Sequence, residues 1–180
     1  AGNILGVVLV FRDVSHEYRM QQAVRENEAR FRELFAHMSS GVAVYRAVDE
    51  GNDFEFLDLN TAGANIDKLR KEDVLGRRLS YVFPRVKEFG LLDVLRQVWR
   101  TGVPQHHPIS EYTDQRITGW RENFVYRLPT REVVAVYEDI TQRKQAELAL
   151  KSSESRYRRL FTSIRDAILV TDTNRKIIDC

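Results

Sequence analysis

The sequence predicts an α+β fold in which a five-stranded antiparallel sheet carries helices on one face and a linker helix flanks each end. Three observations predict it: two strand-like segments precede a helical region, three strand-like segments follow that region, and a 126-residue repeat sets the limits of the unit. Strands that are grouped in this way, rather than alternating with helices, favour an antiparallel sheet with segregated helices.

The first two strands are predicted at residues 41–46 and 54–59. The first segment is rich in β-branched side chains, and the second alternates between apolar and polar residues. Residues 49–53 have turn-forming composition, so the two strands are expected to form a hairpin. Short helices are expected after Asn60 and through residues 70–75, where Gly76 ends the second.

A longer helix is predicted at residues 89–101, because its apolar side chains recur at spacings of three and four. They are Leu91, Leu92, Leu95, Val98 and Trp99. Gly102 is expected to end this helix. Three strands then follow, around residues 106–112, 120–128 and 132–138, with Pro129 in the last turn.

Two separate sequence matches define the repeat. The sequence VVLVFRDVS at residues 7–15 recurs as VVAVYEDIT at residues 133–141, and EARFRELF at 28–35 recurs as ESRYRRLF at 154–161. A shared offset indicates repeating units of one small domain each. We therefore expect the tail of one unit at 1–14, a linker helix at 15–38, a complete unit at 28–140, a second linker helix at 141–164, and the start of another unit at 165–180.

Three segments of the complete unit resemble PAS domains, the sensor modules of many signalling proteins. The sequence DITQRKQAE at residues 139–147 resembles the family's exit sequence, EDVLGR at 72–77 resembles the segment before its long helix, and Asn60 matches an asparagine after its second strand. The resemblance implies the PAS fold and a multi-PAS signalling protein. It also implies that Asp139, Ile140 and Thr141 relay a signal from the last strand into the following helix, whereas the residues alone indicate a turn and a helix cap.

Both linkers have residues at alternating spacings of four and three that are apolar except for one small polar residue at the third position, Asn27 or Ser153, which is typical of a coiled-coil seam. The positions are Met20, Val24, Asn27, Phe31, Leu34 and Met38 in the first linker, and Ala146, Leu150, Ser153, Tyr157, Leu160 and Ile164 in the second. We expect a parallel homodimer through residues 20–27. Residues 31–38 either continue this seam or fold back over their own sheet. Ser15 and Thr141 are expected to cap the two helices.

A ligand pocket, if there is one, is expected between the inner face of the sheet and its helices. The candidate side chains are Tyr45, Trp99, Trp120, Tyr126, Arg121, Glu122 and Asn123. Alternation along the strand puts Trp120, Glu122 and Tyr126 on one face, and Arg121 and Asn123 on the other. Glu122 would need a partner if it were buried. The alternative is that the aromatic residues are ordinary core.

No covalent chemistry is expected from this chain. His16-Glu17-Tyr18-Arg19 lacks the Thr-Pro that follows a kinase phosphoacceptor histidine, and no glycine-rich ATP motif or cyclase signature is present. By resemblance, haem is not expected because residues 89–101 contain no histidine, and a flavin–cysteine adduct is not expected because the single cysteine is Cys180. His106 and His107 are expected in a solvated loop, pointing to opposite sides, so they predict no metal site.

Composition narrows the range of partners. The net charge is +2, with 28 basic and 26 acidic residues interleaved, so no nucleic-acid partner is expected. No apolar run approaches about 18 residues, so direct membrane contact is not expected, and a cytoplasmic location fits, with any tether outside this segment. We expect a sensory and dimerisation module of a sensor histidine kinase, in contact with neighbouring PAS domains, an output domain and a small-molecule ligand. The alternatives are a cyclic-dinucleotide enzyme as parent and a PAS scaffold without ligand.

Overall fold

The computed structural model describes residues 15–163, 170–171 and 177–179. Its core contains a five-stranded sheet of order β2-β1-β5-β4-β3 in which every neighbouring pair is antiparallel. The strands are β1 (Gly41–Val48), β2 (Asp53–Leu59), β3 (Gln105–Thr113), β4 (Thr118–Arg127) and β5 (Val133–Asp139). The predicted sheet and its strands are confirmed. Residues 1–14 and most of 165–180, where we expected parts of neighbouring units, lie outside the described residues, apart from a small pair formed by β6 (Val170–Thr171) and β7 (Ile177–Asp179).

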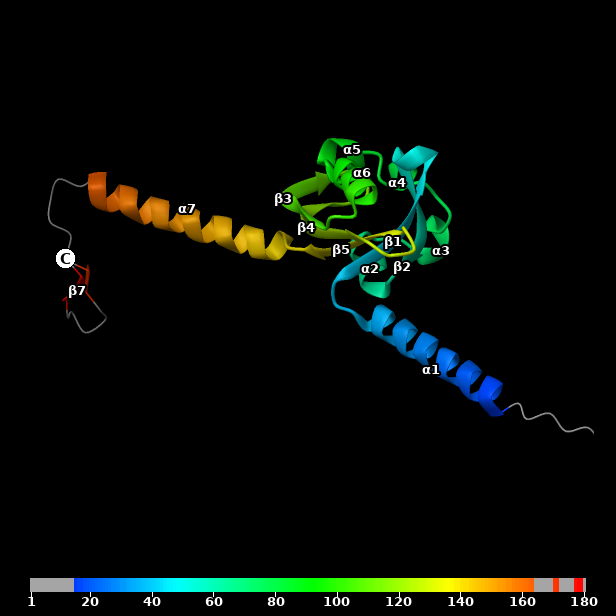
Figure 1. Cartoon of the computed structure of the whole chain (residues 1–180). Coiled ribbons are helices and arrows are strands. Elements are labelled where there is room, and N and C mark those ends of the chain that lie inside the picture. The colour runs from blue at the N-terminus through cyan, green and yellow to red at the C-terminus, as the bar shows by residue number, and fades with distance from the viewer. Residues whose placement is uncertain (1–14, 164–169, 172–176, 180) are drawn as a thin grey trace, which may run out of the picture.

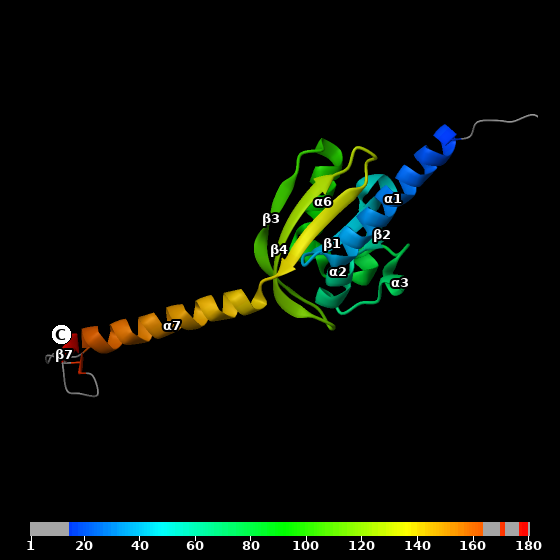
Figure 2. The same ribbon diagram turned by 90° about the horizontal axis from the view of Figure 1, so that it is seen from below.

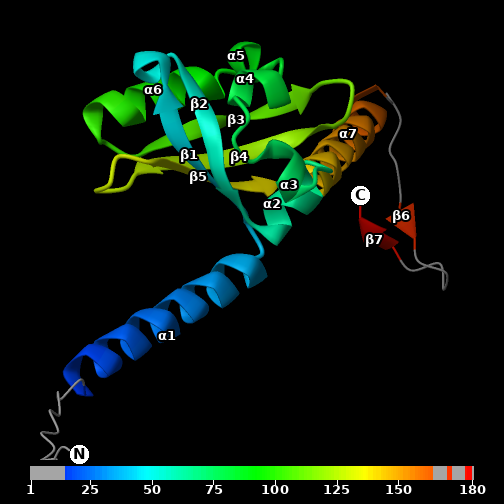
Figure 3. The ribbon, with the colours of Figure 1, turned by 90° about the vertical axis from the view of Figure 1, so that its right-hand side faces the viewer.

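The inner face of the sheet is the face that the short helices cover (Figure 3). These elements are the 3₁₀ turn η1 (Asp49–Gly51), α2 (Thr61–Ile66), α3 (Lys71–Val74), α4 (Leu79–Val82), α5 (Val86–Phe89) and α6 (Leu91–Thr101). The predicted apolar stripe of α6 packs on the sheet, where Leu95 and Val98 lose all exposure and Leu92 retains 4%. Burial of this stripe supplies most of the driving force that holds α6 in place.

The predicted single helix at 89–101 is wrong at its start. α5 ends at Phe89, and Gly90 adopts a φ of 89°, a left-handed conformation that glycine takes without strain and that ends a helix. His107 Nε2 lies 2.8 Å from the carbonyl oxygen of Phe89, so the imidazole satisfies an acceptor that the ended helix leaves open. His107 is therefore a buried part of β3. The expected loop is wrong for both histidines, because His106 belongs to the same strand, although its side chain is exposed as predicted. Gly102, with a φ of 74°, ends α6 as predicted.

The two linkers are continuous helices, α1 (Ser15–His37) and α7 (Thr141–Ser163), which leave the core in different directions (Figure 1, Figure 2). This confirms the predicted flanking helices. The C-terminal end of α1 contacts the core, where Phe35 is 8% exposed and packs with Val42 and Val134 on the outer face of the sheet. Within the described residues, no helix is long and apolar enough to cross a membrane.

Candidate functional site

A cavity of about 40 Å³ lies between the inner face of the sheet and the helices that cover it. Strands β1, β3, β4 and β5 supply its polar side chains together with the end of α2, and α4, α5 and α6 supply mainly apolar ones. The polar side chains are Tyr45, Asp67, Tyr112, Arg121, Asn123 and Tyr137. A buried water needs roughly 10–15 Å³ of such space, so the cavity has room for a few waters or one very small molecule.

Asn60 holds the start of α2 against the sheet. Its Oδ1 accepts hydrogen bonds from the backbone amides of Gly63 and Val42, both at 2.8 Å, and its Nδ2 donates to the carbonyl of Ser40 at 2.9 Å. Asn60 is 2% exposed and serves as the N-cap of α2. Since α2 begins at a fixed point on β1 and has only six residues, the residue that follows it, Asp67, is brought to the cavity.

Asp67 is a buried carboxylate at the cavity wall. Tyr137 donates a hydrogen bond from its hydroxyl to Asp67 Oδ2 at 2.5 Å. Burial raises the pKa of Asp67 to about 6, although the hydrogen bond from Tyr137 and the charges of Arg121 and Arg116 act to lower it. Burial likewise raises the pKa of the Tyr137 and Tyr45 hydroxyls, so both remain neutral donors. The cavity thus contains one carboxyl that exchanges its proton near neutral pH.

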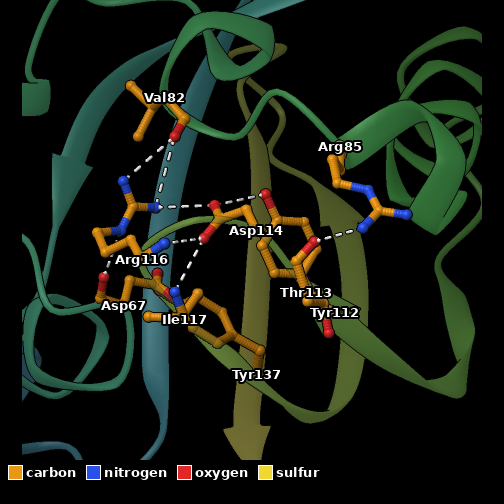
Figure 4. Close-up of polar contacts among 9 residues, drawn as sticks. All are labelled: Asp67, Val82, Arg85, Tyr112, Thr113, Asp114, Arg116, Ile117 and Tyr137. Atoms are coloured by element: carbon orange, nitrogen blue, oxygen red, sulfur yellow. Dashed lines mark hydrogen bonds and ion pairs between the residues drawn. The ribbon is translucent and has the colours of Figure 1, made fainter.

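Asp114 closes the turn between β3 and β4, and Arg116 binds this turn to the helical region (Figure 4). Asp114 Oδ1 accepts from the backbone amides of Arg116 and Ile117 at 2.8 and 2.9 Å, and its Oδ2 accepts from the Tyr112 hydroxyl at 2.9 Å. Arg116 Nε donates to the backbone carbonyl of Asp67 at 3.0 Å. The guanidinium of Arg116 also lies 5.0 Å from the ring centre of Phe83. This network fixes the end of the cavity that holds Asp67.

Two inner-face residues of β4, Arg121 and Asn123, present hydrogen-bond donors to the cavity, and the amide donor of Asn123 is buried without an acceptor among the residues that the structure describes. The Arg121 side chain is 5% exposed, and its guanidinium makes an ion pair from Nη1 to Asp139 Oδ2 at 2.9 Å. Its other hydrogen bond among the described residues also comes from Nη1, to the carbonyl of Trp120 at 3.3 Å. Asn123 is 3% exposed, and its Nδ2 has no acceptor in the described part of the chain. Buried donors without acceptors are rare, and they often mark the place of a water or a ligand.

The junction between β5 and α7 gathers the predicted relay residues. Asp139 Oδ1 accepts from the backbone amide of Thr141 at 2.9 Å and from its hydroxyl at 2.5 Å. Thr141 Oγ1 accepts in turn from the backbone amide of Trp120 at 2.9 Å, and Ile140 is buried at 4% exposure. The prediction that Thr141 caps α7 is wrong, because its hydroxyl bonds back to β4 and the carboxylate of Asp139 receives the first helical amide instead. The side chain of Ser15, the other predicted cap, lies outside the described residues.

Of the predicted pocket residues, only Tyr45, Arg121 and Asn123 line the cavity. Trp120, Glu122 and Tyr126 belong to the opposite strand face and lie on the outer side of the sheet, where Glu122 Oε2 accepts from Arg143 of α7 at 2.9 Å. Trp99 packs beside η1 instead, and the guanidinium of Arg131 lies 5.7 Å from its ring. Because side chains alternate along a strand, residues of both faces cannot line one cavity.

Sequence reasoning missed Asp67, Tyr112 and Tyr137. Tyr137 shares the inner face with Ala135 and Val133, so alternation along β5 could have found it. Asp67 gives no such signal, because it follows a short helix whose orientation depends on the cap at Asn60. Within the described residues, no group of three or more histidine, cysteine, aspartate or glutamate side chains could hold a metal ion.

The predicted dimer seam lies on α1, and its apolar side chains are exposed in the single chain. Met20 is 58% exposed, Val24 54%, Phe31 64% and Leu34 64%. Asn27 is exposed among them. Phe31 also stacks on Phe35 with ring centres 5.7 Å apart. An exposed apolar row of this length is available to a partner helix.

Comparison with known protein families identifies the domain. The sequence model of the PAS fold matches residues 35–145, which is more than half of the chain. The chain belongs to the PAS family. A second model, described as a PAS domain, matches residues 155–180. The resemblance inferred from the exit sequence and from Asn60 is therefore confirmed.

Relatives of known sequence or structure agree with this PAS fold. The chain is 23% identical over 177 residues to sporulation kinase E of Bacillus subtilis (strain 168), covering 94% of this chain and 22% of that protein. It is 17% identical to a solved domain of a sensory box sensor histidine kinase/response regulator from Geobacter sulfurreducens, covering 64% of this chain and 96% of that one, with a TM-score of 0.50. An RNA-binding light-oxygen-voltage receptor is 16% identical, covering 71% of this chain and 37% of that one, with a TM-score of 0.54. The chain thus spans about a fifth of the kinase that it matches.

Proposed function

We propose that this chain is a sensory PAS module that performs no covalent chemistry and transmits the state of its cavity to α7. The observation that carries the proposal is a continuous set of contacts from the cavity to the helix. Arg121 lines the cavity and pairs with Asp139, and the same carboxylate holds the first amide of α7 at Thr141. A change at Arg121 therefore alters the support of α7 through one intermediate side chain.

The relay can be tested with Asp139→Asn. This change weakens the ion pair with Arg121 and the charge-assisted bond to the first amide of α7, so the first two turns of the helix should open more often. A hydrogen bond to a charged acceptor contributes about 1 kcal/mol more than one to a neutral acceptor, and this difference corresponds to roughly fivefold faster hydrogen exchange at residues 141–148. Glu138→Gln is the matched control, since Glu138 is the preceding strand residue and contacts Ser40 instead. Equal exchange in the two variants would refute the relay.

We also propose that α1 forms a parallel homodimer seam through Met20, Val24, Asn27, Phe31 and Leu34. Support comes from the exposure of the apolar members of this row in the single chain and from their coiled-coil spacing. Leu34→Glu should produce monomers, because each of the two copies loses about 1.5–3 kcal/mol of free energy from burial of the leucine side chain. The two losses together raise the dissociation constant of the dimer roughly 10²–10⁴-fold. Ala29→Glu adds the same charge on the opposite side of α1 and should remain dimeric.

Light scattering on both variants measures the outcome against a chain mass of 21.0 kDa. A Leu34→Glu protein that keeps twice this mass would exclude the seam. A monomeric Ala29→Glu protein would show instead that added charge anywhere on α1 prevents association.

The parent protein is proposed to be a sensor histidine kinase with an output domain after this segment. The similarity to sporulation kinase E and the matching histidine kinase domain support this assignment. The match of residues 155–180 to a PAS domain supports the proposal that residues 165–180 begin another PAS unit, with 15–38 and 141–164 as the connecting helices. A PAS scaffold without ligand remains the second candidate, because the cavity measures only about 40 Å³.

A further inference from the structure

We infer that the cavity binds a short aliphatic monocarboxylate whose two oxygens are held by Arg121 and Asn123. This inference rests on the proposed sensory function, because it names the class of ligand for the same cavity. Three features carry it: donors on β4 that face the cavity, an apolar remainder of the wall, and a carboxyl group at Asp67 that can accept a proton.

The first feature is the set of hydrogen-bond donors that β4 presents to the cavity. The ion pair and the hydrogen bond that Arg121 makes in the described part of the chain both come from Nη1, so neither contact occupies the N–H groups of Nε and Nη2. Asn123 is two residues away on the same strand face, and its amide nitrogen has no acceptor among the described residues. The planar guanidinium fork matches the two oxygens of a carboxylate. The hydroxyl of Tyr45, which stays protonated, lines the same space.

Charge favours an anion over a neutral acceptor. The only counter-ion that Arg121 contacts within the described residues is Asp139, whose side chain is 39% exposed and therefore partly solvated. A buried cation is stabilised by a buried anion more than by a solvated one. The rest of the cavity wall includes Leu79, Phe83, Val86 and Ile117, which suit a short hydrocarbon tail. The small volume restricts that tail to a few carbon atoms.

Asp67 gives the inference a pH signature. The groups that face it are Tyr137 from β5, Tyr45 from β1, Arg121 from β4, and Arg116 and Asp114 from the β3–β4 turn. The pKa of its carboxyl is already about 6, and a second negative charge in the cavity raises that pKa further. Each bound carboxylate therefore retains or takes up one proton at Asp67. Above pH 6 the affinity should fall toward tenfold per pH unit, since the free protein must gain that proton to bind.

The test uses the full 180-residue chain with propionate as the probe and propionamide as its neutral isostere, at constant ionic strength. Titration calorimetry and thermal unfolding at pH 6.5 and 7.5 measure the dissociation constant and the Tm. Propionate at about one hundred times its dissociation constant should raise the Tm by several degrees, and the constant should weaken about tenfold between the two pH values. Propionamide should produce neither effect.

Two variants locate the binding. Asn123→Leu replaces the amide by an apolar side chain of similar volume and should weaken propionate binding at least tenfold. Glu122→Gln changes the neighbouring outer-face residue, which does not line the cavity, and should bind as the native protein does. If Asn123→Leu does not fold, Arg121→Lys provides the second variant, because lysine keeps the charge and loses the planar fork.

Binding of propionamide as tight as that of propionate would overturn the inference and leave the sensory function standing, because the ligand would then be neutral. Propionate binding that is absent, independent of pH, or unchanged in both cavity variants would overturn it as well. The proposed relay is tested separately by hydrogen exchange in Asp139→Asn, which needs no ligand. The two proposals can therefore fail independently.

Discussion

Replacing Asp67 with asparagine should make the protein more stable at neutral pH and leave a smaller difference at acid pH. The side chain is 6% exposed, and its pKa in the folded protein is about 6 against an ordinary value of 3.8. The folded state therefore binds a proton more tightly than the unfolded state, so stability falls as pH rises from about 4 to 6 and then levels off. The substituted asparagine carries no charge to desolvate, and its amide oxygen can still accept from Tyr137.

The magnitude follows from the two pKa values. The pKa in the folded protein lies about two units above the ordinary value, and this difference corresponds to roughly 3 kcal/mol of lost stability at neutral pH. About 2 kcal/mol of this loss develops between pH 4.5 and 7.5. Urea unfolding of the native protein and of Asp67→Asn at several pH values in this interval measures it. The difference in unfolding free energy between the two proteins should grow by about 2 kcal/mol in favour of the variant.

A matched control separates this effect from the titration of other groups. Asp73 is an exposed aspartate whose hydrogen bond from Arg70 lowers its pKa below 3.8, so the difference between native protein and Asp73→Asn should stay nearly constant from pH 4.5 to 7.5 and change only below about pH 4. A difference between native protein and Asp67→Asn that stays constant with pH would refute the reasoning. A difference of the opposite sign would mean that Arg121 and Arg116 outweigh burial at Asp67.

Two further substitutions test the packing around the site. Gly119→Ala would place a Cβ 2.5 Å from Thr141 Oγ1. Urea unfolding should therefore show a loss of about 1–3 kcal/mol of unfolding free energy, and hydrogen exchange in α7 should accelerate. Thr118→Ala, at the exposed neighbouring position, should change neither. Leu95→Ala removes a side chain with 0% exposure and should cost about 2–5 kcal/mol of unfolding free energy. Leu75 is 38% exposed, so Leu75→Ala should cost less than about 0.5 kcal/mol. Equal losses in the two variants would refute the assignment of the core.

The fold was predictable because its signals are local and periodic. The β-branched composition of β1, the alternation along β2, the apolar stripe of α6 and the glycine at 102 each depend on neighbouring residues only. The break at Gly90 was missed because the stripe continues across it from Phe89, and a period of 3.6 residues does not report a single left-handed residue. α4 has only four residues, which is too short for any helical period to emerge.

The site was less predictable than the fold because it depends on which residues meet across the sheet. Sequence alternation separated Arg121 and Asn123 from Trp120 and Glu122, but it could not show which of the two strand faces the helices cover. Aromatic content favoured the wrong face, since the outer side of β4 carries Trp120 and Tyr126. The helices between β2 and β3 decide which face of β4 is covered, and these helices lie far from β4 in the sequence.

Strand β4 gives the physical link between the cavity and α7, because its two faces contact different partners. On the inner side, Arg121 lines the cavity and stands directly opposite Asp139 in the β4–β5 register. On the outer side, Glu122 pairs with Arg143, and the backbone amide of Trp120 donates to Thr141. The start of α7 is therefore held from both faces of one strand. The three contacts come from consecutive residues of β4, so a shift of this strand relative to α7 would change all of them.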